Sequence, residues 1–277
     1  MRIFTLDGQS YDVLVPVDGG LTREAVVADG PLAGRTKAHS MQRDLAGTFY
    51  NYTLKFSALR RNVGQYDALY EELTAPVAFH RLVVPYAQGM MEYEAYISKV
   101  PDTLKSCFRG VREWGDASVT FTAMEPQRVP GEDQPRVPLI GSPDAGNKLF
   151  RIDGLGYDVI VKKDGGVNRE ADIADGPLAK RSMAYRMRRD LAGTFYNYTM
   201  AFDTTYLNVA QYDALYEILT APVDNHQIMV PYGQGFLEYQ AYISKVTDSL
   251  KSCIHGVQRW GDLTVTFTAV SPHRRPQ

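Results

Sequence analysis

The sequence contains only two cysteines and no long hydrophobic run. Two cysteines are too few for a disulfide framework, so a reducing compartment is expected. No apolar stretch approaches the ~20 residues that a membrane-spanning helix needs. Residues 1–8 lack the apolar stretch and the small-residue cleavage site of a signal peptide. Thirty basic against 32 acidic side chains leave a formal charge of -2, which argues against a broad basic surface for nucleic acids or anionic membranes.

The remaining composition is that of a folded protein with a core. Of the 277 residues, 44% are hydrophobic and 22% are charged, which excludes global disorder and leaves room for two domains. The unusual feature is the aromatic content, with 18 tyrosines beside 11 phenylalanines. Such residues suit half-buried β-sheet surfaces and interfaces.

An internal repeat determines the predicted organisation. Residues 4–126 align without a gap onto residues 150–272, and roughly 78 positions are identical. A unit of this size is a domain and not a solenoid repeat. The sequence therefore predicts a tandem duplication, with one domain at 1–126 and a second at 148–277. Residues 127–147, rich in proline and glycine, read as an extended linker.

Within each repeat the pattern is mostly β. Alternating polar and apolar residues, as in 49–56, are typical of strands. One helix is expected in each repeat, near 62–74 and 208–220, where Asn62 and Asn208 stand at the capping position. Six to eight strands with one flanking α-helix predict a mainly β fold, a β-sandwich or split barrel, duplicated in tandem. The segment 104–108 gives no clear signal.

The cysteines and histidines offer the strongest hint of catalysis. Cys107 and Cys253 occupy equivalent positions, and His80 and His226 are the only histidines kept in both repeats. A Cys–His dyad would need an activated thiol and an adjacent base, and nothing in the local sequence marks either residue. Packed side chains and free thiols are favoured. A disulfide between the two repeats would require the two sites to meet.

Other chemistry is weaker still. Metal-binding and phosphate-loop spacings are missing from the sequence. Glu92 and Glu94 share one strand face, which favours a solvated surface over a glycosidase pair. Asn51 and Asn197 fit the glycosylation sequon but are expected to be ordinary strand residues. The sequence thus predicts no enzyme and assigns no catalytic, cofactor-binding or metal-binding residue.

For several aromatic and charged residues, the sequence allows either a structural role within the domain or a role at an interface. Trp114 and Trp260 precede the last strand of each repeat and could close the core or anchor an interface. Six tyrosines carry the same two alternatives: Tyr86, Tyr93, Tyr96, Tyr232, Tyr239 and Tyr242. The Arg-Asp pairs at 43–44 and 189–190 could orient a turn or contact a neighbouring subunit.

Four motifs carry a resemblance to a known family. They are Asp-Gly-x-x-Tyr-Asp-Val, Arg-Asp-Leu-x-Gly-Thr-x-Tyr-Asn-Tyr-Thr, a Tyr-Asp-x-Leu-Tyr helix ending in Ala-Pro-Val, and Phe-Thr-Ala-x-x-Pro. In these motifs, both repeats resemble siphophage and prophage tail proteins of the distal-tail and tail-tube-like family from Gram-positive gut bacteria. The resemblance implies a β-sandwich or split barrel with one helix, six-fold rings, and no catalytic residues.

The leading hypothesis is therefore a structural virion component, made in the bacterial host cytoplasm and placed at the distal tail or the tube-to-tip hub. Its partners would be further copies of itself and other tail proteins, such as tube, tape measure and hub. Three chains would supply six domains, so a trimer is favoured over a six-chain ring. The alternative is a tandem carbohydrate-binding module with aromatic platforms. A cysteine hydrolase is the least favoured.

Overall fold

The computed structural model describes residues 3–108, 110–132, 135–143, 149–176, 178–181, 183, 187–204 and 208–276. The protein is mainly β, as predicted, with 54% of residues in strands and two helices in the described part. Every pairing with an assigned register is antiparallel, for example β6 (His80–Tyr86) with β7 (Gly89–Ile97). Neither helix is long and apolar enough to cross a membrane.

The chain forms two compact units, and these do not follow the predicted domain boundaries. Unit 1 comprises Met1–Val26, Thr48–Val129 and Thr247–Leu263. Unit 2 comprises Val27–Gly47, Pro130–Val246 and Thr264–Gln277. Each repeat therefore contributes a segment to the unit formed mostly by the other repeat. The two segments are residues 27–47 of the first repeat and 247–263 of the second.

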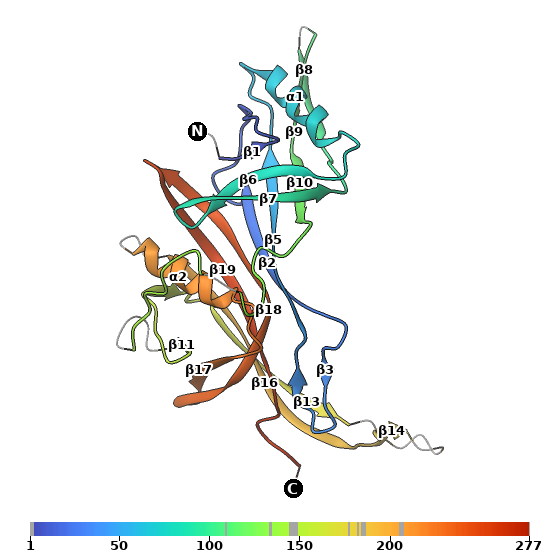
Figure 1. Ribbon diagram of the computed structural model, residues 1–277, viewed down its shortest axis with the longest axis vertical. Coiled ribbons are helices and arrows are strands. Elements are labelled where there is room, and N and C mark those ends of the chain that lie inside the picture. The colour runs from blue at the N-terminus through green and yellow to red at the C-terminus, as the bar shows by residue number, and fades with distance from the viewer. Residues whose placement is uncertain are drawn as a thin grey trace. The chain divides into compact units, whose positions relative to one another are not determined.

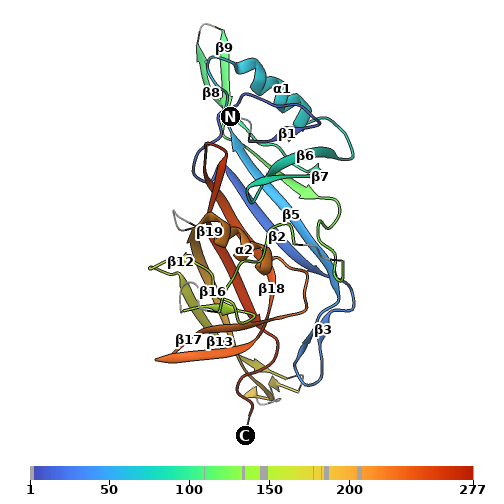
Figure 2. The ribbon, with the colours of Figure 1, turned by 60° about the vertical axis from the view of Figure 1, so that its left-hand side comes forward.

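Unit 1 contains most of the strands of the first repeat. The strand order is β1-β6-β7-β10-β5-β2, and the last part of β18 lies beside β2. The elements not yet given are β1 (Thr5–Leu6), β2 (Leu21–Asp29), β5 (Leu45–Phe56), β8 (Thr103–Phe108), β9 (Val111–Gly115), β10 (Ala117–Ala123) and α1 (Val63–Leu73). Figures 1 and 2 show β2 and β5 running side by side.

Unit 2 contains most of the second repeat. Its β16 pairs with both β12 and β13, and β17 pairs with both β11 and β18. The elements are β3 (Gly34–Arg35), β4 (Met41–Gln42), β11 (Arg151–Ile152), β12 (Val159–Val161), β13 (Val167–Asp175), β14 (Lys180–Arg181), β15 (Met187–Arg188), β16 (Leu191–Thr204), α2 (Val209–Leu219) and β17 (His226–Tyr232). The first part of β18 (Gly235–Ile254) and the last part of β19 (Val257–Ala269) also belong to this unit.

Strand registers recur between the repeats where the sequences agree. Thr5 lies opposite Val83 on β1 and β6, and Arg151 lies opposite Met229 on β11 and β17. These pairs are related by the same sequence offset of 146 residues, and the β6–β7 and β17–β18 pairs follow it too. The shared hydrophobic pattern thus fixes the same local pairing twice.

The two helices lie where the sequence predicts them, each within one residue of the expected ends. Asn62 and Asn208 occupy the N-cap position, but neither side chain makes a capping hydrogen bond, so that detail of the prediction is wrong. At the other end the hydroxyl of Thr74 donates to the carbonyl of Tyr70 at 2.8 Å. This bond satisfies one of the carbonyls left open at a helix end.

The described part of the predicted linker packs against α2. The amide of Arg136 donates to Glu217 Oε1 at 2.8 Å, and Gln211 Nε2 donates to the carbonyl of Ile140 at 2.9 Å. Residues 211–219 are all buried. In α1 only Tyr66, Leu69 and Leu73 are buried, so the equivalent helix surface in the first repeat is open.

One hairpin adopts different structures in the two repeats. The first hairpin (101–117) contains β8 and β9, which form a separate two-stranded sheet beside α1 (Figure 1). The second hairpin (247–263) is the end of two long strands, β18 and β19, that continue without interruption. Pro101 stands where the second repeat has Thr247. Because proline lacks an amide hydrogen, it cannot continue a strand ladder as Thr247 does.

Candidate functional site: a hairpin-binding surface

In unit 1, strand β2 binds the second hairpin through a buried ion pair. Arg23, at 1% exposure, donates from Nε to Asp248 Oδ1 at 3.0 Å and from Nη2 to Asp248 Oδ2 at 2.5 Å. This is the two-pronged geometry that guanidinium and carboxylate groups favour. A buried pair of this kind contributes little net stability, but loss of either partner is costly. The pair therefore selects one position for the hairpin on β2.

Aromatic rings enclose the guanidinium of Arg23. Its Cζ lies 4.1 Å from the ring centre of Trp260 and 5.1 Å from that of Tyr86. Trp260 is completely buried, so the cation–π contact is shielded from water. Burial also raises the pKa of Tyr52, which lies in the same region. The second hairpin thus covers the charged centre of β2 with an apolar ring.

Polar contacts hold the edge of this surface. Lys251 Nζ pairs with Asp18 Oδ1 at 2.6 Å and also contacts Asp262. Although burial lowers the pKa of Lys251, the two carboxylates outweigh it, and the pKa is raised. The side chain of Gln88 donates to the carbonyl of Gln258 at 3.0 Å and accepts from the amide of Gln258 at 3.1 Å. These contacts hold the second hairpin to residues of the first repeat at points away from the Arg23–Asp248 pair.

A reciprocal segment lies in unit 2. The first arm, residues 27–47, comes from the first repeat and contacts strands of the second. Arg43 donates to Asp29 Oδ1 at 2.7 Å, to the carbonyl of Val27 at 2.9 Å and to the carbonyl of Ile243 at 2.9 Å. Its Cζ lies 5.4 Å from the ring centre of Tyr242. The arginine side chain is only 2% exposed.

The tip of the first arm makes further contacts in unit 2. The amide of Met41 donates to the carbonyl of Val270 at 2.9 Å. The guanidinium of Arg35 stacks on Phe195, with Cζ 4.6 Å from the ring centre. The arm is therefore bound along its length by strands of the other repeat.

The same residues in the second repeat are exposed. Strand β13 is equivalent to β2, yet Arg169, Glu170 and Ala171 are all exposed on it, whereas β2 alternates between buried and half-buried residues. Arg169 keeps one contact of Arg23, since its Cζ lies 5.0 Å from the ring centre of Tyr232. Among the described residues, β13 pairs with β16 alone, so its other edge is open.

The second arm, residues 173–193, shows the same difference. Arg189 donates to Asp175 Oδ1 at 2.8 Å and to the carbonyl of Ile173 at 3.1 Å, as Arg43 does within its own arm. Its side chain is 45% exposed, against 2% for Arg43. Arg189 thus keeps its contacts to Asp175 and Ile173, and its side chain is largely uncovered in the described structure.

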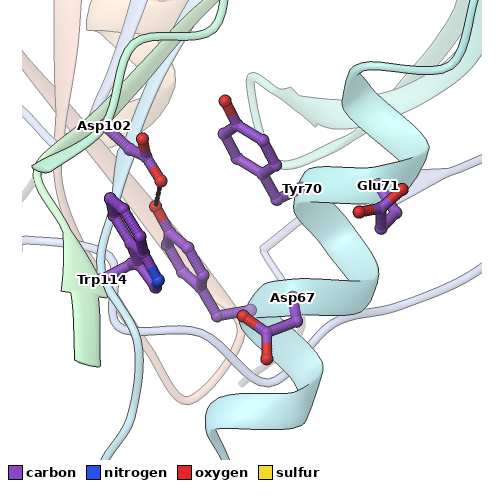
Figure 3. Close-up of a pocket in the computed structure, with 6 residues that line it drawn as sticks. Asp67, Tyr70, Glu71, Asp102 and Trp114 are labelled. Carbon is purple, nitrogen blue, oxygen red and sulfur yellow. Dashed lines mark hydrogen bonds between the residues drawn. The ribbon is translucent and has the colours of Figure 1, made fainter. Parts of the chain in front are cut away.

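The first hairpin is also incompletely covered. Leu104 is 44% exposed, whereas its counterpart Leu250 is 6% exposed. A cavity of about 270 Å³ lies between the hairpin and α1 (Figure 3). The residues that line it are Tyr66, Asp67, Tyr70, Glu71, Asp102 and Trp114. Asp102 accepts a hydrogen bond from the hydroxyl of Tyr66 at 3.0 Å. Three carboxylates and three aromatic rings suit a guanidinium group.

The structure gives the predicted cysteine and histidine candidates separate roles. His80 Nδ1 lies 2.7 Å from Asp7 Oδ2, and His226 Nδ1 lies 2.7 Å from Asp153 Oδ2. Both cysteines are free thiols, as predicted, with Cys107 exposed. Burial raises the pKa of Cys253, the opposite of activation.

The His80–Asp7 pair also belongs to a group that could hold a metal ion, with Glu72 as the third member. Asp7 is already engaged, because Oδ1 accepts from the amide of Arg81 at 2.7 Å. In the second repeat Ile218 replaces Glu72, and the histidine–aspartate pair persists. The pair joins the turn at the start of each repeat to a strand, β6 in the first repeat and β17 in the second, and this clasp explains the pair in both.

The remaining candidates lie at separate places. Glu92 is exposed and pairs with Arg81 across the strands at 2.5 Å, a solvated strand face. Asn51 accepts from the amide of Ala123 at 3.0 Å, so this sequon asparagine is a strand residue. Asp44 accepts from the amide of Leu32 at 3.0 Å and orients a turn.

In the Arg-Asp dipeptide of the first arm, the turn-orienting role is therefore observed, and contact with a neighbouring subunit stays a prediction. The aspartate orients a turn, and the arginine of the first arm binds strands of the other repeat.

Sequence reasoning missed Arg23 and Arg169. The available signal was the string Arg-Glu-Ala, kept in both repeats in the middle of a predicted strand. A charged residue there needs a partner if it faces the core.

No family model matches the sequence, and no curated protein matches it significantly.

Proposed function

We propose that this protein is a structural component of a phage tail, at the distal tail or the tube-to-tip hub, and that it assembles into a pseudo-six-fold ring. The observation that carries the proposal is the exchange of segments between the repeats. The first repeat binds the hairpin of the second on β2, and the second repeat binds the arm of the first. The repeat unit is thus built to bind another copy of itself.

The direction of these contacts favours a ring. Both contacts join a first repeat to a second repeat in a head-to-tail sense, so the interface is heterologous. Such an interface forms a closed ring if the rotation between units closes and a filament if it does not. Three chains would place six similar repeats around one axis. Among ring-forming proteins, we favour a phage tail protein because the four sequence motifs resemble those of tail proteins.

The surfaces support an assembly protein over a carbohydrate-binding module. Of the predicted tyrosine platforms, Tyr86, Tyr93 and Tyr239 are buried. Tyr96 and Tyr232 are partly exposed. The guanidinium of Arg169 lies over Tyr232, and that of Arg43 lies over Tyr242, the counterpart of Tyr96. A ring face covered by a guanidinium is less available to stack on a sugar.

The test is the mass and symmetry of the purified protein. Multi-angle light scattering across a concentration series is expected to give a species of three chains of 31.0 kDa each. Negative-stain images are expected to show rings with six similar lobes. Six chains in a ring would favour the hexamer instead. A monomer at all concentrations, with retention on a glycan array, would contradict the proposal and favour the carbohydrate-binding alternative.

A further inference from the structure

We infer that the open edge of β13 binds the first hairpin of a second copy of this chain, and that Arg169 pairs with Asp102 and Trp114 of that copy. This inference rests on the proposed function and names the contact between chains. Arg169, Asp102 and Trp114 are identical to Arg23, Asp248 and Trp260, which meet inside unit 1. The chain therefore already displays the geometry of the contact.

The acceptor is a strand edge with a fixed cation. Backbone groups along one edge of β13 have no strand partner in the described structure. An exposed edge of this kind readily adds a further strand. Arg169 is held over Tyr232 as Arg23 is held over Tyr86, so its guanidinium needs no rearrangement to receive a carboxylate.

The donor is an acidic and aromatic hairpin. Asp102 and Trp114 both line the cavity in Figure 3 together with two further carboxylates. No lysine or arginine lines this cavity among the described residues. The second hairpin carries the same aspartate and tryptophan, and there both are buried around Arg23. The acidic charge of this hairpin therefore complements Arg169 of a second copy of the chain.

The arms point to the same interface independently. The first arm uses Arg43 to bind the carbonyl of Ile243 beside Tyr242. The equivalent partners for Arg189 are Ile97 and Tyr96 of a second copy. Arg189 is 45% exposed and Tyr96 is 42% exposed. One head-to-tail contact would cover both the arm and the edge of β13.

Release of the first hairpin from α1 is a part of this assembly. The hairpin forms its own two-stranded sheet and is attached to the helix by the Tyr66–Asp102 hydrogen bond. Exchange of that bond for a pair with Arg169 is favourable because the guanidinium offers two hydrogen bonds to the carboxylate, as Arg23 does to Asp248, where Tyr66 offers one. Pro101 keeps the unbound hairpin from continuing β7.

The experiment compares charge reversals in the full chain by light scattering. Arg169→Asp and Asp102→Arg should each weaken association on the order of 100-fold, as expected for the loss of a desolvated charge pair. Between unlike chains, an equal mixture of the two variants offers one native pair and one charge-swapped pair, so it should recover association that neither variant shows alone. The double variant Asp102→Arg/Arg169→Asp should recover assembly in part. Asp224→Arg, a reversal at an exposed loop residue, is the matched control and should assemble like the wild type.

The outcomes separate the two claims. Wild-type assembly that persists in Arg169→Asp and in Asp102→Arg overturns this contact and leaves the ring proposal standing. A wild-type chain that stays monomeric overturns both. Arg169 is exposed, so its reversal does not disturb folding, and circular dichroism of each variant checks this. For Asp102, the milder Asp102→Asn variant should also weaken association if Asp102→Arg fails to fold.

Discussion

The two hairpins share ten of their 17 residues and lie in very different environments. The second hairpin places Trp260 and Leu250 in the core of unit 1, whereas the first leaves Trp114 half-buried and Leu104 exposed. The strands that bind them differ in the same way, since β2 is covered and β13 is open. The comparison teaches that burial is set here by an available partner and not by the residues of the hairpin. Four predictions test this difference.

The largest expected effect is at the two tryptophans. Trp260→Ala should lower the free energy of unfolding by about 4 kcal/mol, because it opens a cavity in a packed site and removes the cation–π contact. Trp114→Ala should cost about 1 kcal/mol in dilute solution, since a half-buried ring has less to lose. Denaturant unfolding of both variants measures the difference. Equal losses would mean that the two hairpins are equally well packed.

The two arginines give the next contrast. Arg23→Met should lower the free energy of unfolding by about 3 kcal/mol, because it leaves Asp248 charged and buried. Arg169→Met should change it by less than about 0.5 kcal/mol, since Arg169 is exposed in the isolated chain. The double variant Arg23→Met/Asp248→Leu should recover much of the loss. A large loss for Arg169→Met alone would show that β13 already has a partner within the chain.

These contrasts also show what the sequence can and cannot predict. The mainly β class and both helices follow from alternation, helical spacing and Pro76, all of which are local signals. The exchange of hairpins does not follow, because Leu-Lys-Ser-Cys and Trp-Gly-Asp occur in both hairpins and adopt two arrangements.

The two hairpins are distinguished by whether they pair with a strand of the other repeat. Among the local sequence differences, Pro101 in place of Thr247 is the one with a clear physical consequence. The candidate site was missed for a related reason. Arg23 and Arg169 are identical in sequence, and a side chain becomes a site only when its partner strand is known.

A smaller effect concerns the histidine clasps, which should behave alike in the two repeats. Burial raises the pKa of Asp7 and of Asp153, but hydrogen bonds from His80 and His226 outweigh it, and both pKa values are lowered. The stabilisation is therefore complete above the unfolded value of about 3.9 and is lost as the pH falls through the folded value.

The clasp variants test this dependence on pH. Asp7→Asn or Asp153→Asn should cost about 1 kcal/mol at pH 6 and less at pH 2. Unfolding curves at the two pH values check this. A loss in Asp7→Asn that is the same at both pH values would contradict the assignment.

The cysteines should show the smallest effect. Cys253→Ser should lower the free energy of unfolding by roughly 1 kcal/mol, because Cys253 lines a mostly apolar pocket together with Val15 and Leu250. Cys107→Ser should have an effect within about 0.5 kcal/mol, since that thiol is exposed. Intact mass with and without reductant should be unchanged apart from adducts. A shift of two protons on reduction would indicate a disulfide.

Hydrogen exchange on β2 and β13 at rising protein concentration tests the central claim most directly. Amides 21–26 of β2 should be protected at every concentration, because the second hairpin covers them within the chain. Amides of β13 that do not bond to β16 should exchange quickly in dilute solution and become protected as the protein assembles. In Arg169→Asp they should stay unprotected. Fast exchange of β13 in an assembled wild-type sample would contradict the claim that this edge binds another copy.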